Sequence, residues 1–374
     1  MPSLAWRNTL QDRARLTVTL TGIVFALVLV AVQLGLFVGF TRTTSNIIDH
    51  SAADIWVCSR GIPYFDVGSV LPERRLYQVL EVPGVQAAEK LIVRFTTWKR
   101  PDGGEETIEI VGFNPASRLT GPWDIGAGSV DALAQRDTVL IDESYRDKLG
   151  VQRLGETVEI RGRRARVVGF TRGIRSFTTA PFVFASFQDA LDYAQLKEDE
   201  TIYVLVRAAP GIDPAVLRDR IARAVSDVDV YTASEFSRKT ESYWMFTTGA
   251  GIALLIAAAM GFVVGVAVVA QTVYASTIDR LREYGTLKAI GASNGFVSAL
   301  VAKQALMVAG AGYVLAMALS LVVVRFAQQS GAPIVLPWQL AALMLLMALV
   351  MSLGGSVFSI RKALSVDPSM VMKL

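Results

Sequence analysis

The sequence is poor in the residues that most metal and covalent catalytic sites require. Its 374 residues include one cysteine, Cys58, and one histidine, His50. These counts exclude an internal disulfide, a cysteine-based metal cluster and a multi-histidine metal site. A Ser-His-Asp triad would have to use His50, so we do not expect one. We expect His50 to be an exposed side chain rather than a heme or metal ligand, and Cys58 to be a small buried hydrophobic side chain.

Charge is also scarce. Asp, Glu, Lys and Arg make up 19% of the residues, against ~25% in typical soluble domains, and the mean hydropathy is +0.42. The net charge of +4 and the lack of a basic run with interleaved aromatics give no indication of nucleic-acid binding. No G-x-x-x-x-G-K-[ST] phosphate-binding loop occurs, so we expect no catalytic site, cofactor or metal on this chain, which would not be an enzyme.

Long runs with almost no charge predict four transmembrane helices, because ~20 apolar residues cross a ~30 Å hydrocarbon core. The predicted spans are residues 17–40, 242–278 (including an extension beyond the membrane), 304–324 and 338–360. The first run is longer than the ~7–15 apolar residues of a cleaved signal peptide, so we expect it to remain as a helix.

Lysine and arginine near the ends of the spans indicate the orientation. They gather in residues 1–16, 279–303 and 361–374 and are sparse on the other side, next to residues 325–337 and the two ends of 41–241. We therefore expect both termini and the 279–303 loop in the cytoplasm, and the other two segments outside. In a bacterium, the membrane that the helices cross would be the inner membrane.

The long external segment, 41–241, predicts a mixed α/β domain. The fold class is then an α-helical integral membrane protein with four transmembrane helices and a large extracytoplasmic α/β domain between helices 1 and 2. Pro101–Gly104 predicts a β-hairpin turn. The strand order predicts one α/β subdomain from both ends of the segment, with a smaller β-rich subdomain inserted at about residues 114–200. The paired acids Asp142-Glu143 and Glu105-Glu106 point apart and predict no acid/base site.

The most distinctive stretch is residues 277–293, TIDRLREYGTLKAIGAS. Gly285 and Gly291 bracket residues 286–290, which predicts a compact helix between two glycine hinges, attached to two membrane helices. Such a helix suits the docking of a cytoplasmic partner. The alternative is an amphipathic turn lying on lipid headgroups.

Small residues recur at every fourth position of the second predicted span. They are Gly249, Ala253, Ala257, Gly261 and Gly265. Small side chains let helix backbones approach closely in lipid. This stripe is either the seam of a homodimer or a surface that packs against the other spans of the same chain, and both interpretations stay open.

The pattern Arg-x-x-Glu-x-Gly-x-Leu-Lys-Ala-Ile-Gly-Ala-Ser from Arg280 to Ser293 resembles the signature of FtsX-like ABC transporter permeases. It is most similar to the DevC type, which is related to heme-exporting and macrolide-exporting permeases. The resemblance covers the whole chain, from Ala5-Trp6-Arg7-Asn8 before the first span to Arg361–Pro368 at the end.

The resemblance implies a homodimer with eight spans and two copies of a separate ATPase, which would carry the ATP and Mg²⁺. In many relatives a periplasmic membrane-fusion adaptor extends the route outward. Unlike the macrolide-exporter branch, this sequence contains no fused ATPase. The residues that the resemblance assigns to coupling with the ATPase are Arg280, Glu283, Gly285, Leu287, Lys288, Ile290 and Gly291.

Two functions fit these expectations. The first is a permease that uses a partner ATPase to export or extract an amphipathic or lipid-like substrate by mechanotransmission. The second is a transmembrane signalling relay that controls an extracytoplasmic hydrolase or sensor and transports nothing. A substrate that alters the ATPase rate of the complex would favour the first function. No motif in the sequence identifies that substrate.

Overall fold

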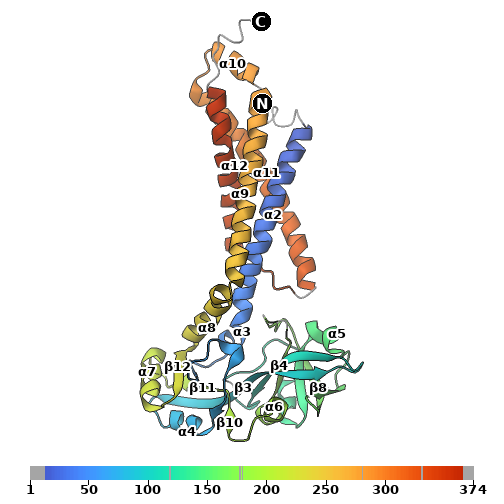
Figure 1. Cartoon of the computed structure of the whole chain (residues 1–374), viewed down its shortest axis with the longest axis vertical. Coiled ribbons are helices and arrows are strands. Elements are labelled where there is room, and N and C mark those ends of the chain that lie inside the picture. Colours follow the sequence, from blue (N-terminus) through green and yellow to red (C-terminus); the bar gives the residue numbers. More distant parts are fainter. Residues whose placement is uncertain are drawn as a thin grey trace. The chain divides into compact units, whose positions relative to one another are not determined.

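The computed structural model describes residues 13–117, 119–176, 178, 180–279, 281–329 and 332–364. The chain divides into two compact units. We call Met1–Gly39 with Gly249–Leu374 the helical unit, and Phe40–Thr248 the α/β unit. Figure 1 labels their elements.

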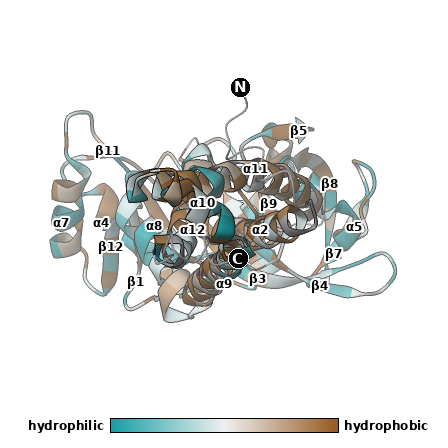
Figure 2. Ribbon diagram, turned by 90° about the horizontal axis from the view of Figure 1, so that it is seen from above, coloured by the Kyte–Doolittle hydropathy of each residue, from teal (hydrophilic) through white to brown (hydrophobic). Residues whose placement is uncertain are grey.

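The helical unit contains four helices that are long and apolar enough to cross a membrane. They are α2 (Arg13–Thr44, whose last residues belong to the α/β unit), α9 (Ala250–Asp279), α11 (Asn294–Gln329) and α12 (Trp338–Leu364). Seen from above in Figure 2, hydrophobic residues cover these helices on most sides. The predicted fold class, with four membrane helices and an α/β domain between the first two, is confirmed.

Two of these helices begin at residues that the charge pattern does not indicate. α11 begins at Asn294, before the predicted third span at residues 304–324, because the Ser293 hydroxyl accepts from the Phe296 N–H (3.2 Å) and caps the first turn. Lys303 is therefore an exposed residue within the helix and not its boundary. α9 begins at Ala250, immediately after Gly249, whose φ of +79° interrupts the helical path.

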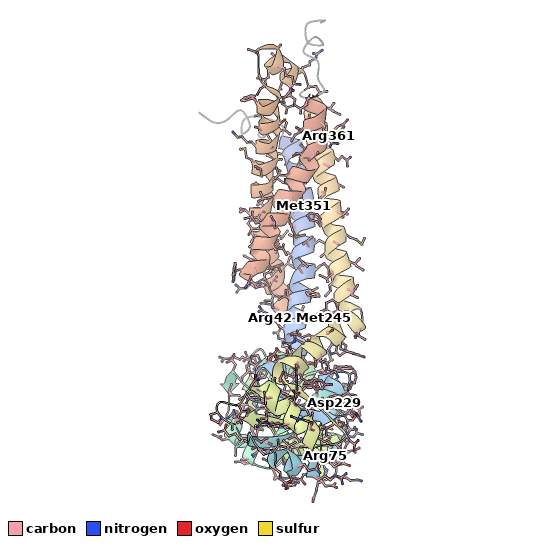
Figure 3. The ribbon with its side chains drawn as sticks, turned by 90° about the vertical axis from the view of Figure 1, so that its left-hand side faces the viewer. Arg42, Arg75, Asp229, Met245, Met351 and Arg361 are labelled. Carbon is pink, nitrogen blue, oxygen red and sulfur yellow. The ribbon has the colours of Figure 1, made fainter. Side chains whose placement is uncertain are left out.

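Close approach of backbones holds the bundle together. A Cβ placed on Gly355 of α12 would lie 2.8 Å from the backbone nitrogen of Ala270 in α9, and one on Gly265 would lie 2.8 Å from the Ala26 Cβ in α2. Met351, which Figure 3 labels on α12, is wholly buried. Around these contacts lies a buried cluster made of Ile23, Ala26, Leu27, Ala31, Val269, Ala316, Met344, Ala348 and Met351. The glycines are therefore packing residues within one chain.

The α/β unit is built on one ten-stranded sheet in the order β12-β1-β11-β3-β4-β9-β6-β8-β5, with β7 beside β3 and β8. The strands are β1 (Ile55–Ser59), β3 (Val85–Lys99), β4 (Glu105–Phe113), β5 (Ile125–Ala127), β6 (Thr138–Asp142), β7 (Thr157–Ile160), β8 (Arg163–Thr171), β9 (Phe182–Ser186), β11 (Tyr203–Ala208) and β12 (Val228–Thr232), and β2 (Leu71–Pro72) pairs separately with β10 (Glu200–Thr201). The β4–β9 and β6–β8 pairs are parallel and the other pairs are antiparallel.

The expected separate subdomain at about residues 114–200 is instead a continuation of this sheet. β3 is 15 residues long and serves both parts: Leu91 pairs with Tyr203 of β11, and Ile92 pairs with Gly112 of β4. One buried cluster includes Trp56 of β1 as well as Val183 of the inserted strand β9. The long shared strand joins the two parts, so residues 114–200 do not form a subdomain with a core of their own. The hairpin turn predicted at Pro101–Gly104 is confirmed, since Lys99 pairs with Glu105 across it.

Short helices cover the sheet and connect its strands. They are α3 (Asn46–Asp49), α4 (Arg74–Leu80), α5 (Arg146–Leu149), α6 (Phe187–Ala194), α7 (Pro214–Ala224) and α8 (Ala233–Ser242), with 3₁₀ turns η1 (Phe65–Val67), η2 (Val130–Ala134) and η3 (Glu143–Tyr145) and the π-helix η4 (Tyr243–Thr247). Alternate residues of β1 serve two cores: Ile55 and Val57 pack in the cluster with α4 and α7, while Trp56 and Cys58 belong to the larger cluster. Burial raises the pKa of the Cys58 thiol to about 12, which agrees with the predicted buried, unreactive role.

The bundle packing gives a matched test on two neighbouring glycines. Gly355→Val places methyl groups against the backbone of α9 and should cost about 1–3 kcal/mol of stability. Gly354→Val meets nothing within 4 Å, so it should change stability by less than about 0.5 kcal/mol. Thermal unfolding of the purified protein in detergent measures both. Equal losses for the two variants would contradict the packing described here.

Candidate functional site

The segment predicted to dock a partner forms the helix α10 (Leu281–Ala289). It ends in a Schellman motif: the Gly291 N–H donates to the Lys288 carbonyl (3.0 Å) and the Ala292 N–H donates to the Leu287 carbonyl (2.9 Å). Gly291 supplies the left-handed residue that this motif requires, with φ +100°. The glycine hinge predicted at Gly291 therefore has a defined geometry.

Gly285 is not the hinge that the sequence analysis predicts. It is buried in the middle of α10, and the helix begins at Leu281 rather than at Thr286. A glycine inside a helix costs about 1 kcal/mol relative to alanine. Here the preceding residue, Tyr284, is buried against the rest of the helical unit and holds the turn in place. Arg280, another predicted coupling residue, lies outside the described residues.

The inner face of α10 is attached to three membrane helices. Tyr284 is 1% exposed and forms a small cluster with buried residues at the start of α11. Leu287 packs against the same cluster. The cluster contains Tyr284, Val297, Leu300 and Val301, with Val273 of α9, Leu287, Met307 of α11 and Ile360 of α12 packed around it. The sequence analysis does not single out Tyr284, although its i,i+3 spacing from Leu287 places both on one face.

Lys288 ties α10 to the end of α12. Its ammonium group donates a 2.7 Å hydrogen bond to the carbonyl oxygen of Leu364. A cation at a helix C-terminus is stabilised by the exposed carbonyl groups and by the helix dipole. Two of the predicted coupling residues, Leu287 and Lys288, thus contact the helices of their own chain.

The tip and outer face of α10 are open. Ile290, directly after the helix, is 78% exposed, and Phe296 in the first turn of α11 is 49% exposed. Glu283 and Gly291 are exposed as well. Burial of such large apolar side chains against a partner would be favourable, because it removes their apolar area from water. The α10 segment therefore has an inner face fixed to the bundle and an apolar tip.

The stripe of small residues on the second span divides into two parts. Gly249 precedes α9 and is not helical, while Ala253 is exposed and Ala257 is half-buried. A Cβ on Gly261 would lie 3.1 Å from Leu29 in α2, and Gly265 also contacts α2. For Gly261 and Gly265 the structure favours packing within the chain over a dimer seam. The homodimer itself stays a prediction.

Neither His50 nor the basic residues beside β7 build a convergent site. The His50 ring stacks on Trp123, with centroids 3.9 Å apart, and its Nδ1 lies 2.8 Å from the Asn46 carbonyl oxygen. The described residues contain no group of three or more potential metal-binding side chains. A hollow of about 490 Å³ beside β7 is lined by Lys99, Arg100, Pro101, Thr157, Val158, Glu159, Gly162 and Arg164.

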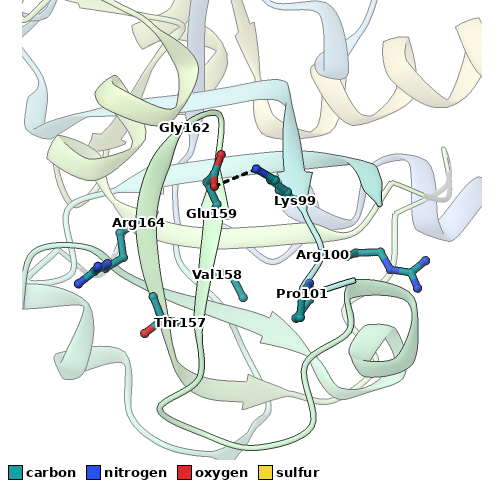
Figure 4. A pocket seen from close by; sticks show the side chains of 8 residues that line it. All are labelled: Lys99, Arg100, Pro101, Thr157, Val158, Glu159, Gly162 and Arg164. Atoms are coloured by element: carbon teal, nitrogen blue, oxygen red, sulfur yellow. Dashed lines mark hydrogen bonds and ion pairs between the residues drawn. The ribbon is translucent and has the colours of Figure 1, made fainter. Parts of the chain in front are cut away.

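The geometry of that hollow does not favour an anionic ligand. Lys99 is paired with Glu159 at 3.4 Å, so its charge is already compensated. In Figure 4, Arg100 and Arg164 extend away from each other instead of pointing at a common position. An anion placed there would be held by no pair of convergent guanidinium groups.

Comparison with known proteins identifies the family. Residues 16–224 match the MacB-like periplasmic core domain, and residues 243–368 match the FtsX-like permease C-terminal model. The chain belongs to the MacB-like and FtsX-like ABC transporter permeases. Such a permease is a transport component rather than an enzyme, and it works with an ATPase partner. The DevC-type assignment stays a prediction.

Curated relatives agree with this assignment. An uncharacterized ABC transporter permease of Mycobacterium tuberculosis strain H37Rv is 28% identical over 374 residues, which cover 98% of this chain and 96% of that one. Another, from Mycobacterium bovis, is 26% identical over 368 residues, with the same coverage of 98% and 96%. The likeness extends over both units of the chain.

Solved structures resemble part of the chain. The periplasmic region of MacB from Actinobacillus actinomycetemcomitans is 13% identical with a TM-score of 0.39, covering 52% of this permease and 96% of that chain. The extracellular domain of the transporter YknZ from Gram-positive bacteria is 14% identical with a TM-score of 0.35, covering 48% and 98%.

Substitution by aspartate should lower stability on the inner face of α10 and leave it nearly unchanged at the tip. Leu287→Asp brings a carboxylate into the cluster around Tyr284 and should lower stability by about 2 kcal/mol. Ile290→Asp places the carboxylate in water and should change stability by less than about 0.5 kcal/mol. Hydrogen exchange of the α10 amides and thermal unfolding measure the difference. A destabilising Ile290→Asp would show that the tip is packed in the folded permease.

Proposed function

We propose that this permease is the membrane subunit of an efflux system, and that the exposed tip of α10 is the seat of its separate ATPase. The observation that supports the proposal is the division of α10. Tyr284 and Leu287 fix one face to the bundle, while Ile290 presents an apolar side chain that is 78% exposed. A push on the tip would move the bundle, because α10 is attached to it.

The attachments define the route by which force would enter the bundle. The Tyr284 cluster joins α10 to α9 and α11, and Lys288 joins it to the end of α12. α2 and α9 continue along the chain into the α/β unit. Closure of two ATPase subunits, which would hold the ATP and Mg²⁺, would therefore be passed by mechanotransmission to the α/β unit.

The proposed orientation follows the distribution of lysine and arginine. Both termini and α10 lie in the cytoplasm, and the α/β unit lies in the periplasm, where an adaptor protein would meet it. The exposed sides of the spans are apolar, as at Val263 (64% exposed), Val314 (64%) and Leu346 (56%). They would contact membrane lipid and the second copy of the homodimer. A substrate taken from this environment would be amphipathic or lipid-like.

The proposed ATPase seat is tested by Ile290→Asp. A charge in a buried interface loses the apolar contact and leaves the carboxylate desolvated, so association with the ATPase should weaken at least about tenfold. Val216→Asp, at a 47% exposed apolar residue of α7 in the α/β unit, is the matched control and should leave association unchanged. Co-purification and ATPase assays of the reconstituted complex measure both variants. Normal ATPase binding by Ile290→Asp would remove α10 as the seat.

The proposed orientation is tested by introducing a cysteine at position 216 or 290 in separate variants. The native Cys58 is buried, so an impermeant maleimide should label Cys58 slowly. Val216→Cys should react in right-side-out vesicles, and Ile290→Cys should react only after the membrane is permeabilised. Labelling of both from the same side would rule out force transfer across the membrane by this route.

A further inference from the structure

Two carboxyl groups meet inside the α/β unit, far along the chain from the α10 segment. Asp66 lies in the turn η1 and is 7% exposed, and Glu109 lies on β4 and is fully buried. Each of these side chains is a neighbour that shifts the pKa of the other. Two neighbouring carboxyl groups repel each other when both are ionised, so burial of the pair favours a proton on one of them.

Among the described residues, no Lys, Arg or His is one of the groups that shift the pKa of either carboxyl group. Neither oxygen of Glu109 has a hydrogen-bond partner among these residues. The ionisable groups near the pair are Tyr64, next to η1, and Tyr203 on β11. Tyr243 in η4 is a neighbour of Tyr64, and Cys58 on β1 is a neighbour of Tyr203. All of these become negative when they ionise. The carboxyl pair therefore depends on its own proton.

Burial acts in the same direction. Desolvation raises the pKa of Glu109 well above its usual range, and the neighbouring Asp66 raises it further. Desolvation also raises the pKa of Asp66, although the Trp244 indole, which donates to it, works against this shift. The proton stays on the pair at a pH where an exposed carboxyl group is ionised.

The pair holds a turn against the segment that leads into α9. The Trp244 Nε1–H donates to Asp66 Oδ2 (3.2 Å), and the Tyr64 ring stacks on Tyr243 with centroids 4.2 Å apart. The Phe65 N–H donates to the Thr240 hydroxyl (3.3 Å) at the end of α8. Tyr243 and Trp244 begin the π-helix η4, which is followed by Gly249 and α9. Single π-helical turns are uncommon and are often found at functional sites.

We propose that Asp66 and Glu109 form a proton-dependent latch. With one shared proton, the pair fixes η1 to the π-helix η4. When that proton is lost to solvent, the two carboxylates repel each other, Asp66 leaves its position, and Trp244 is released. The latch regulates how firmly the α/β unit holds η4, the segment that precedes α9 in the chain, and it does not depend on the proposed ATPase seat.

The sign of the pH dependence follows from the raised pKa values. The stabilisation is fully present below the ordinary carboxyl range and is lost as the pH rises through the raised pKa of the pair. Between these limits the closed latch holds one proton more than the open one. The opening constant should therefore rise by up to about tenfold per pH unit.

Hydrogen exchange of the full chain in detergent, between about pH 5 and pH 9, tests the latch. Exchange in residues 64–68 and 240–248, corrected for the intrinsic pH dependence of amide exchange, should give an opening constant that rises with pH in the wild-type protein. Glu109→Gln keeps a neutral donor for Asp66 and should make the opening constant independent of pH. Asp66→Asn provides a second variant, because its amide can still accept from Trp244 and donate to Glu109.

Asp189→Asn is the matched control. Asp189 is another buried carboxyl group, but it is paired with Arg136 at 3.1 Å, and its substitution should leave the pH dependence at residues 64–68 and 240–248 intact. A wild-type opening constant that is flat across the pH range would overturn the proposal. So would a pH dependence as steep as that of the wild type in whichever of Glu109→Gln and Asp66→Asn folds.

Discussion

The helical unit depends on the approach of helix backbones to within contact distance. In hydrocarbon each backbone N–H and C=O must be bonded internally, which requires helices, and apolar surface gives them no reason to associate. Association must come from packing, which needs small residues at the crossings. Gly355 against Ala270 and Gly265 against Ala26 supply such crossings between α9 and its neighbours. Displacement of one helix therefore requires its neighbours to move.

Because the bundle is tightly packed, the attachment of α10 to it matters. α10 covers nine described residues, Leu281–Ala289. It is held by the burial of Tyr284 and by the hydrogen bond from Lys288 to the end of α12. A motif that reads as a partner-binding signature thus contains two kinds of residue. Some attach the helix to its own bundle, and Ile290 with its neighbours is exposed.

Local signals made part of this structure predictable. Uncharged runs indicated the four spans, the Pro-Asp-Gly-Gly sequence indicated the β3–β4 turn, and Gly291 marked the end of α10. α11 extends beyond the predicted third span to Asn294, because a long cationic side chain such as Lys303 is tolerated on an exposed helix face. The predicted hinge at Gly285 is wrong, because the burial of Tyr284 beside it is a tertiary contact.

Features that join distant segments could not be read from the chain. The fusion of the predicted subdomains depends on β3 pairing with β11 at one end and with β4 at the other. Asp66 lies in the turn η1 and its neighbour Glu109 lies on β4, and the whole of β3 separates them along the chain. Nothing in the local sequence of either residue marks it as buried or paired.

The carboxyl pair is an unusual way to hold a segment in a well-packed domain. The main cluster of the α/β unit is built from apolar side chains whose burial is favourable at any pH. Two apolar residues at positions 66 and 109 would fill the space without the cost of desolvating carboxyl groups, and buried polar pairs are often less stable than such replacements. What the carboxyl pair adds is a condition, since it holds only while protonated. That condition applies to the turn that grips Trp244, at the point where the α/β unit passes into α9.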